Sequence, residues 1–129
     1  MTPGLDGVDH IHINVVDRAV SERWYAEVLG FSRVRELEFW AVDGGPLTLT
    51  DARGNIHLAL FESDQIQGTT IAFRVSAAGL AQWMSHLAAN GIEVEPVDHQ
   101  ISWSVYFEDI DGNRYEITTY EYTEFRNRA

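Results

Sequence analysis

An internal repeat constrains the fold of this chain more than any other feature of its sequence. Three landmarks recur at nearly constant spacing: His10 and Thr70 are 60 positions apart, Gly30 and Gly91 are 61 apart, and Gly54-Asn55 and Gly112-Asn113 are 58 apart. Landmarks at a nearly constant offset indicate two copies of one structural unit. We therefore expect repeats over about residues 7–62 and 68–120, followed by a C-terminal tail over residues 121–129.

The first copy begins with a strand that has one polar and one apolar side. Residues 8–16 alternate, and the polar side carries His10, His12 and Asn14. A helix follows, because Asp17 is a good N-cap and Gly30 a good helix stop. We expect its buried stripe to contain Val20, Trp24 and Val28, and the next three strands to span residues 31–42, 46–50 and 55–62.

The second copy follows the same order. Residues 69–75 are typical of a strand, and a helix with an apolar stripe at Leu80, Trp83, Met84 and Leu87 comes next, followed by strands at residues 92–97, 102–108 and 114–120. Each copy then has one helix to cover one face of a four-stranded sheet. We predict an α+β fold in which two βαβββ modules form a curved, cup-shaped mixed sheet with the helices on its outer face.

Composition bounds the class of protein. At 129 residues, 45% of them hydrophobic, the chain is large enough for a single folded domain over residues 1–129. A formal net charge of −11 and the complete absence of lysine oppose nucleic-acid binding. No run approaches about 18 apolar residues, so we expect no membrane partner. The absence of cysteine and of an N-terminal signal pattern favours a cytoplasmic location.

Three segments of the sequence resemble the vicinal oxygen chelate superfamily, which includes glyoxalase I, fosfomycin-resistance transferases, extradiol dioxygenases and bleomycin-binding proteins. They are residues 10–17, 24–31 and 106–116. Relatives commonly have Phe where this chain has Trp24, and Pro where it has Ile110. The resemblance extends over nearly the whole chain and implies the fold strongly. It implies the reaction weakly, because one scaffold carries unrelated chemistries.

The resemblance also implies a site for a divalent metal, Fe, Mn, Ni or Zn. The family's ligand on the first strand corresponds to His10, and its ligand on the last strand corresponds to Glu116. The two other ligand positions fall at Thr70, a poor ligand, and near Ala59, or at Leu58 if the repeats are aligned without gaps. The metal site is thus incomplete by the family pattern unless His12 or His57 contributes a third ligand.

Further residues of the expected cup are candidates for substrate binding and catalysis. His57 would face the cup if the neighbouring Leu58 and Leu60 pack under a helix. We expect His12, His57, Trp40, Ser102 and Ser104 to contact the substrate. His99 and Tyr106 are the candidate catalytic residues, and His99 could act as a general acid or base because imidazole titrates near neutrality.

Two functions remain open from the sequence. The first is a small-molecule metalloenzyme, a lyase or dioxygenase, whose metal chelates vicinal substrate oxygens. The alternative is a metal-free protein that binds a drug or metabolite, as bleomycin-resistance proteins do, and the residues at Thr70 and Ala59 favour it. Relatives of this length imply a homodimer in either case. The aromatic tail would pack on the body of the chain or on the second subunit.

Overall fold

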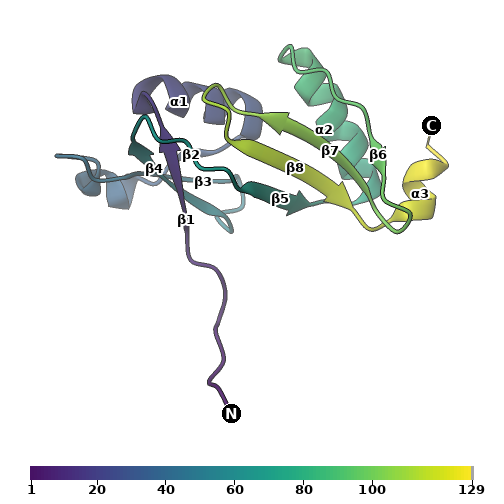
Figure 1. Cartoon of the computed structure of the whole chain (residues 1–129), viewed down its shortest axis with the longest axis horizontal. Coiled ribbons are helices and arrows are strands. Elements are labelled where there is room, and N and C mark those ends of the chain that lie inside the picture. Colours follow the sequence, from purple (N-terminus) through teal and green to yellow (C-terminus); the bar gives the residue numbers. More distant parts are fainter. Residues whose placement is uncertain (129) are drawn as a thin grey trace. The chain divides into compact units, whose positions relative to one another are not determined.

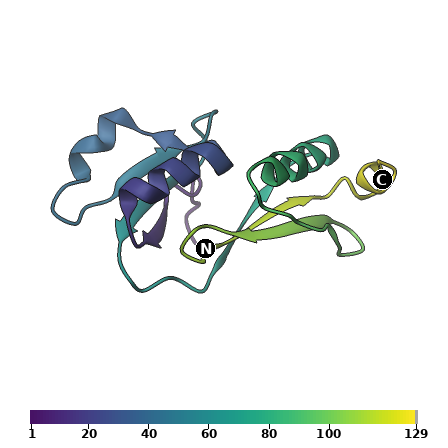
Figure 2. The ribbon, with the colours of Figure 1, turned by 90° about the horizontal axis from the view of Figure 1, so that it is seen from above.

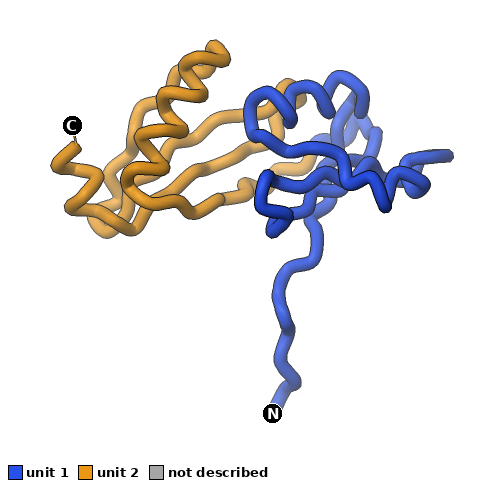
Figure 3. Tube along the Cα trace, turned by 180° about the vertical axis from the view of Figure 1, so that it is seen from behind, with its two compact units in different colours: residues 1–66 blue, residues 67–129 orange. Residues whose placement is uncertain are grey.

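The computed structural model describes residues 1–128, which divide into two compact units (Figure 3). Unit 1 comprises residues 1–66, and unit 2 begins at residue 67. The boundary lies between the two predicted repeats. Each unit has an open four-stranded mixed sheet with a helix on one face (Figures 1 and 2). The α+β class and the two-module organisation are confirmed, whereas a joint cup and a single domain stay predictions.

Unit 1 contains four strands, an α-helix and two helical segments of other types. In chain order these are β1 (Ile11–Val15), α1 (Arg18–Trp24), η1 (Tyr25–Leu29), β2 (Ser32–Arg33), η2 (Arg35–Trp40), β3 (Leu47–Thr50) and β4 (His57–Glu62). The strand order is β1-β4-β3-β2, in which β1 runs parallel to β4 and the other pairs are antiparallel. Asp17 caps α1 by accepting from the backbone N–H groups of Ala19 and Val20, as predicted.

Unit 2 repeats this order of strands. Its elements are β5 (Thr70–Arg74), α2 (Ala77–Ala89), β6 (Val97–Asp98), β7 (Trp103–Glu108), β8 (Arg114–Thr119) and α3 (Tyr122–Arg126). The strand order is β5-β8-β7-β6, again with one parallel pair, β5 with β8. The two sheets therefore share one topology, which confirms the repeat.

Two equivalent hairpin turns show the repeat at atomic detail. Asp51 and Asp109 each begin a turn between two strands, and each accepts hydrogen bonds from backbone N–H groups four residues further on, at Asn55 and Asn113 (2.8 Å in both cases). Both turns contain a glycine with positive φ, a conformation that side chains with a Cβ rarely adopt. An i to i+3 turn at residues 109–112 is closed by the bond from the Gly112 N–H to the Asp109 carbonyl (3.2 Å).

The apolar face of each sheet packs against its helix. In unit 1 the side chains of Leu49, Leu58 and Leu60 are fully buried, and in unit 2 those of Val105 and Tyr115 are. Burial of Leu58 and Leu60 leaves His57 on the opposite face of β4, half-buried. His57 thus lies on the sheet face opposite the helix, as expected from the packing of Leu58 and Leu60, and its place in a cup stays a prediction.

The predicted strand over residues 31–42 is wrong for most of its length. Only Ser32 and Arg33 pair with β3, and residues 35–40 form the 3-10 helix η2. The run Arg35-Glu36-Leu37-Glu38 consists of good helix formers. Acidic side chains in the first turn favour the helix further. Trp40 therefore lies at the end of a helix and not on a strand that lines a cup.

Two further predictions need correction. The buried residues of the first helical stretch are Ser21, Tyr25, Val28 and Leu29, whereas Val20 is 40% exposed and Trp24 half-buried. The stripe thus lies about one position further along than predicted, and Tyr25 takes the central place. The strand predicted at residues 92–97 is reduced to Val97–Asp98, because Pro96 has no N–H to donate to a sheet.

The C-terminal tail packs on unit 2. The ring of Trp103 stacks on Tyr122 and lies against Phe125, with ring centroids 5.4 and 5.5 Å apart. The indole N–H of Trp103 donates to the Tyr122 carbonyl (3.2 Å). Of the two predicted packing places for the tail, the body of the same chain is the one observed. Among residues 1–128, no helix is both long and apolar enough to span a membrane.

Candidate functional site

The histidine-bearing face of unit 1 is the face turned away from its helix. His12 on β1 lies beside Ala59 on β4, and Ala59 lies beside Thr48 on β3. His12 is exposed, whereas its strand neighbour Ile13 is 4% exposed. This alternation confirms the predicted polar and apolar sides of the first strand. His12 and His57 therefore share one face of the sheet: Ala59 is the neighbour of His12 on β4, and His57 lies two residues before Ala59 on that strand.

His10 and His12 face each other directly. Nε2 of His10 lies 3.0 Å from Nε2 of His12, and the rings stack with an interplanar angle of 22°. The other ring nitrogen of His10, Nδ1, lies 2.7 Å from the Oδ2 atom of Asp9. The ring of His12 also lies against Phe61, with centroids 4.7 Å apart. Asp9 was not among the predicted site residues, although its place directly before His10 is a signal that the sequence carries.

Glu116 lies on β8 in a network of hydroxyl groups in unit 2. It pairs with Ala72 on one side and Tyr106 on the other. The Oγ atom of Ser104 lies 2.7 Å from Oε2 of Glu116 and 2.9 Å from Oγ1 of Thr118. A hydroxyl has one proton, and a carboxylate only accepts, so Ser104 donates to Glu116. Ser104 is fully buried, and this donation fixes the orientation of the carboxylate.

His99 and Tyr106, the two predicted catalytic residues, lie together in unit 2. Nε2 of His99 is 2.9 Å from the Tyr106 hydroxyl oxygen. Burial raises the pKa of Tyr106, and the negative charge of Glu116 and a hydrogen bond to it raise the pKa further against an opposing bond from Ser104. Tyr106 therefore keeps its proton at neutral pH and acts as a hydrogen-bond donor. Its side chain remains accessible, since the residue is 44% exposed.

Strand register establishes which positions of the two units are equivalent. His12 pairs with Ala59, and Ala59 pairs with Thr48. In unit 2 the corresponding row is Ala72, Glu116 and Tyr106. Ala59, rather than Leu58, is therefore the counterpart of Glu116, which decides between the two alignments. Two residues earlier on the first strand of each unit, Thr70 is the counterpart of His10.

The remaining candidates occupy varied surroundings. Trp40 is 47% exposed at the end of η2, Ser102 is 8% exposed, and the backbone carbonyl of Ser102 accepts from the His99 N–H (2.9 Å). Their roles in substrate binding stay predictions, as do those of His12, His57 and Ser104.

His10 belongs to unit 1 and Glu116 to unit 2, and their pairing around a metal stays a prediction. Among residues 1–128, no group of three or more His, Asp or Glu side chains is placed to hold an ion.

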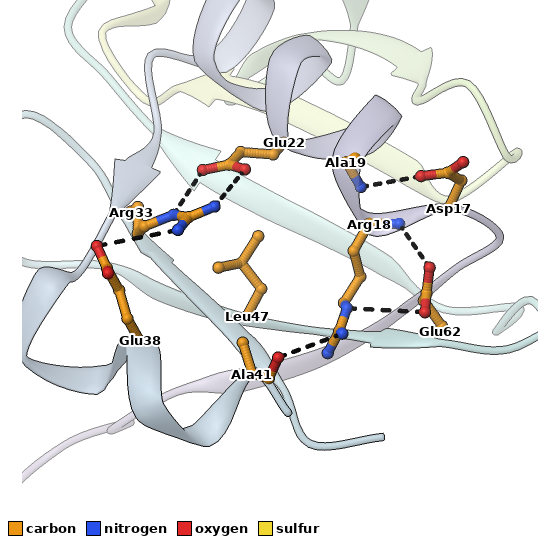
Figure 4. A pocket seen from close by; sticks show the side chains of 9 residues that line it. All are labelled: Asp17, Arg18, Ala19, Glu22, Arg33, Glu38, Ala41, Leu47 and Glu62. Atoms are coloured by element: carbon orange, nitrogen blue, oxygen red, sulfur yellow. Dashed lines mark hydrogen bonds and ion pairs between the residues drawn. The ribbon is translucent and has the colours of Figure 1, made fainter. Parts of the chain in front are cut away.

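Unit 1 also contains a pocket of about 370 Å³ that the sequence did not indicate (Figure 4). Its lining is largely charged: Asp17, Arg18, Ala19, Glu22, Arg33, Glu38, Ala41, Leu47 and Glu62. Arg33 binds Glu22 through two hydrogen bonds of 2.9 and 2.8 Å, which raises the pKa of Arg33. Arg18 lies 3.9 Å from Glu62. The charges of this pocket thus pair with one another, and it contains none of the predicted site residues.

Comparison with known proteins identifies the family. The model of the Glyoxalase/Bleomycin resistance protein/Dioxygenase superfamily matches residues 7–117. The chain belongs to this superfamily. The match begins before His10 and ends just after Glu116, so both predicted metal ligands lie within it. The sequence resemblance to the vicinal oxygen chelate superfamily is thereby confirmed.

Among curated relatives, the metallothiol transferase FosB of Staphylococcus haemolyticus is 30% identical over 125 residues, which cover 89% of this chain and 84% of the relative. Solved structures at lower sequence identity share the fold. An integron cassette protein from a Halifax Harbour sewage outfall superposes with a TM-score of 0.76 at 23% identity, covering 89% of this chain and 99% of that one. A mutant of the fosfomycin resistance protein FosX from Listeria monocytogenes, complexed with Mn(II) and 1S,2S-dihydroxypropylphosphonic acid, gives 0.73 at 18% identity, covering 98% and 100%.

Proposed function

We propose that this protein is a small-molecule metalloenzyme of the glyoxalase and dioxygenase type, with His10 and Glu116 as ligands of a divalent ion. The observation that carries the proposal is the presence of an imidazole and a carboxylate at the family's first-strand and last-strand ligand positions. The name of the FosB relative, a metallothiol transferase, and the Mn(II) in the FosX complex support a metal in this superfamily. Fe, Mn, Ni and Zn all accept such donors.

The surroundings of the two donors fit a metal. The hydrogen bond from Ser104 holds the Glu116 carboxylate in one orientation, and Asp9 does the same for the His10 ring. Outer partners of this kind are found around most metal-binding histidines and carboxylates. A bound divalent ion would act as a Lewis acid on two vicinal oxygens of the substrate. The substrate class is therefore a small molecule with adjacent oxygen atoms.

Tyr106 and His99 would handle the substrate beside Glu116. The raised pKa of Tyr106 keeps its hydroxyl protonated, so it can donate a hydrogen bond to a substrate oxygen that gains negative charge. His99, at 2.9 Å from that hydroxyl, can take up or return a proton as a general base or acid. The proton would move between a substrate oxygen and the His99 ring, either directly or through the Tyr106 hydroxyl.

Metal content tests the proposal. Protein purified without chelators should retain a divalent ion by elemental analysis, lose thermal stability after treatment with EDTA, and regain it on addition of Mn(II), Ni(II), Fe(II) or Zn(II). Glu116→Gln should abolish the regain, since it removes the carboxylate charge and keeps the shape. The matched control is Glu93→Gln, which changes an exposed glutamate outside the contacts of His10 and of Glu116. This variant should behave as wild type. A wild-type protein that holds no ion, and that no added ion stabilises, would overturn the proposal.

A metal-free binding protein is the second candidate. The observation in its favour is that strand register places Ala59 and Thr70 at the counterparts of the two proposed ligands, and neither is a good metal donor. A small molecule that raises the melting temperature equally with and without EDTA, and that is not turned over, would establish this function. Turnover that EDTA stops would exclude it. A homodimer and a cytoplasmic location stay predictions under both candidates, and sedimentation velocity tests the first.

A further inference from the structure

We propose that His12 is a second nitrogen ligand of the metal, and that Asp9 orients the adjoining ligand His10. This inference rests on the proposed function and deepens it. Residue Thr70, the counterpart of His10 in the second repeat, is a poor donor, so the family's ligand set lacks one member here. His12 would supply that missing donor from the same strand as His10.

The distance between the two imidazole rings carries the inference. Nε2 of His10 and Nε2 of His12 lie 3.0 Å apart, with each lone pair or proton directed into the space that they share. Two nitrogens bound to one ion at about 2.0–2.1 Å lie about 2.9 Å apart when they form a right angle at the ion, and about 3.4 Å apart at a tetrahedral angle. The observed distance lies within this range.

Asp9 determines which nitrogen of His10 is available. Its carboxylate lies 2.7 Å from Nδ1 of His10, so it holds the proton on Nδ1 and leaves the lone pair on Nε2. This is the nitrogen that faces His12. Carboxylate–imidazole pairs of this kind orient the ring and raise its basicity toward a metal. Asp9 is thus a positioning residue, which acts on the metal only through His10.

The surroundings of His12 restrict its side chain to the same place. Its ring lies against Phe61, with centroids 4.7 Å apart, and its strand neighbour on β4 is the small Ala59. A larger residue at 59 would compete for the space beside the imidazole. His57 lies on the same sheet face, two residues before Ala59 on β4.

A hydrogen bond between two neutral imidazoles is the alternative explanation of the same distance, with His12 donating from Nε2 and His10 accepting. The two explanations differ in their consequences. A hydrogen bond requires a proton on Nε2 of His12, whereas metal binding requires a free lone pair on both Nε2 atoms, so that His12 must carry its proton on Nδ1. A second imidazole also favours Ni(II) or Zn(II) over Mn(II), because nitrogen donors suit the softer ions.

Titration calorimetry of the full chain with Ni(II) and with Mn(II) tests the inference, using His12→Gln, His10→Gln, Asp9→Asn and Glu116→Gln. The control is His86→Gln, which removes a histidine on α2 to which no role is assigned. We expect His12→Gln to weaken Ni(II) binding by at least about 100-fold, since outer partners alone are worth about 10–100-fold. The loss for Mn(II) should be smaller. Asp9→Asn should cost about tenfold, at the low end of that range, because its side chain is 96% exposed.

Nitrogen-15 spectra of the histidine rings give a readout independent of affinity. On addition of Zn(II), the Nε2 resonances of both His10 and His12 should shift, and Nε2 of His12 should lose its proton signal, while Nδ1 of His10 keeps its own. Wild-type Ni(II) affinity in His12→Gln, together with no change at the His12 ring of the wild-type chain on addition of Zn(II), would overturn this inference and leave the proposed function standing. If Glu116→Gln instead keeps full affinity, the histidine pair binds metal but the proposed function fails. A wild-type chain that binds neither ion overturns both.

Discussion

The two sheets of this protein have the same strand order but carry opposite kinds of chemistry on their polar faces. In unit 1 the face presents two exposed imidazoles, His10 and His12, at its open end. In unit 2 the equivalent row carries a carboxylate, Glu116, with its donor Ser104 fully buried. The apolar faces, by contrast, are built alike. Within the sheets, the two repeats therefore differ in chemistry on the faces turned away from the helices.

Substitutions in the two apolar faces should cause the largest losses of stability, and the losses should be similar in the two units. Leu60→Ala in unit 1 and Ile117→Ala in unit 2 each remove a side chain that is at most 1% exposed. Each should lower the free energy of unfolding by about 2–5 kcal/mol, from lost burial and the cavity that remains. Urea denaturation followed by circular dichroism measures both. A loss below about 1 kcal/mol at one site only would show that the two cores are not equivalent.

The first residues of the two hairpin turns should contribute unequally to stability, although both turns begin with Asp and end with Gly-Asn. Asp109 is 6% exposed and accepts from the N–H groups of Asp111 and Asn113 and from the Asn113 amide. Asp51 is more exposed and accepts from two N–H groups. We expect Asp109→Ala to cost about 2–3 kcal/mol and Asp51→Ala about 1 kcal/mol, because hydrogen bonds to a charged group weigh more when buried. Equal losses in thermal denaturation would contradict this difference.

The pH dependence of the unit 1 turn has a defined sign. Burial raises the pKa of Asp51, but hydrogen bonds from backbone N–H groups, led by that of Ile56, outweigh burial and lower it. A carboxyl whose pKa is lower in the folded state stabilises the fold fully above its unfolded pKa of about 3.9. That stabilisation is lost as the pH falls through the folded pKa. Asp51→Asn should therefore reduce the acid sensitivity of unfolding below about pH 4, as measured against wild type.

The sequence predicted those parts of the fold in which local chemistry and periodicity agree. The Asp17 cap and the alternation around His12 appear as expected, and the repeat correctly predicted that Thr70 is the counterpart of His10. The failures lie where a local pattern is ambiguous. The Phe31–Val42 segment alternates like a strand, but its Arg-Glu-Leu-Glu run forms η2. Burial of Ser104 could not be predicted, because small hydroxyl residues occupy surfaces and buried networks alike.

The candidate site likewise contains residues that the sequence predicted and residues that it did not. Side-chain type and strand parity predicted which residues share a face, and the structure brings His10 to His12 and His99 to Tyr106. The partners that orient the proposed ligands, Asp9 for His10 and Ser104 for Glu116, were not predicted, although Asp9 directly precedes His10 in the sequence. Partners of this kind need a contact between two specific atoms, and such contacts depend on rotamers set by packing.

Ser104→Ala tests whether the buried donor of unit 2 matters to the proposed metal site. Removal of the hydroxyl leaves Oε2 of Glu116 without the bond of 2.7 Å that orients it. We expect metal affinity to fall about tenfold, the usual cost of a lost outer partner, and the pKa of Tyr106 to rise further, because the Ser104 bond opposes its rise. Calorimetry and a tyrosine absorbance titration against Tyr106→Phe measure the two effects. Ser104→Thr, which keeps the hydroxyl, should restore both if the site tolerates the methyl group.

The smallest effect concerns a pair found in unit 2 alone. The Tyr122 hydroxyl donates to both carboxylate oxygens of Asp98 at 2.8 Å. Bonds from the Gln100 N–H and then from Tyr122 lower the pKa of Asp98, and the same bond raises the pKa of Tyr122. Tyr122→Phe should return the Asp98 pKa only part of the way, since the Gln100 bond remains and the pair is fully exposed to screening by salt. Carbon-13 titration of the Asp98 carboxyl at low and high salt measures the shift, and an unchanged pKa would show that the Tyr122 hydroxyl does not stabilise the Asp98 carboxylate in solution.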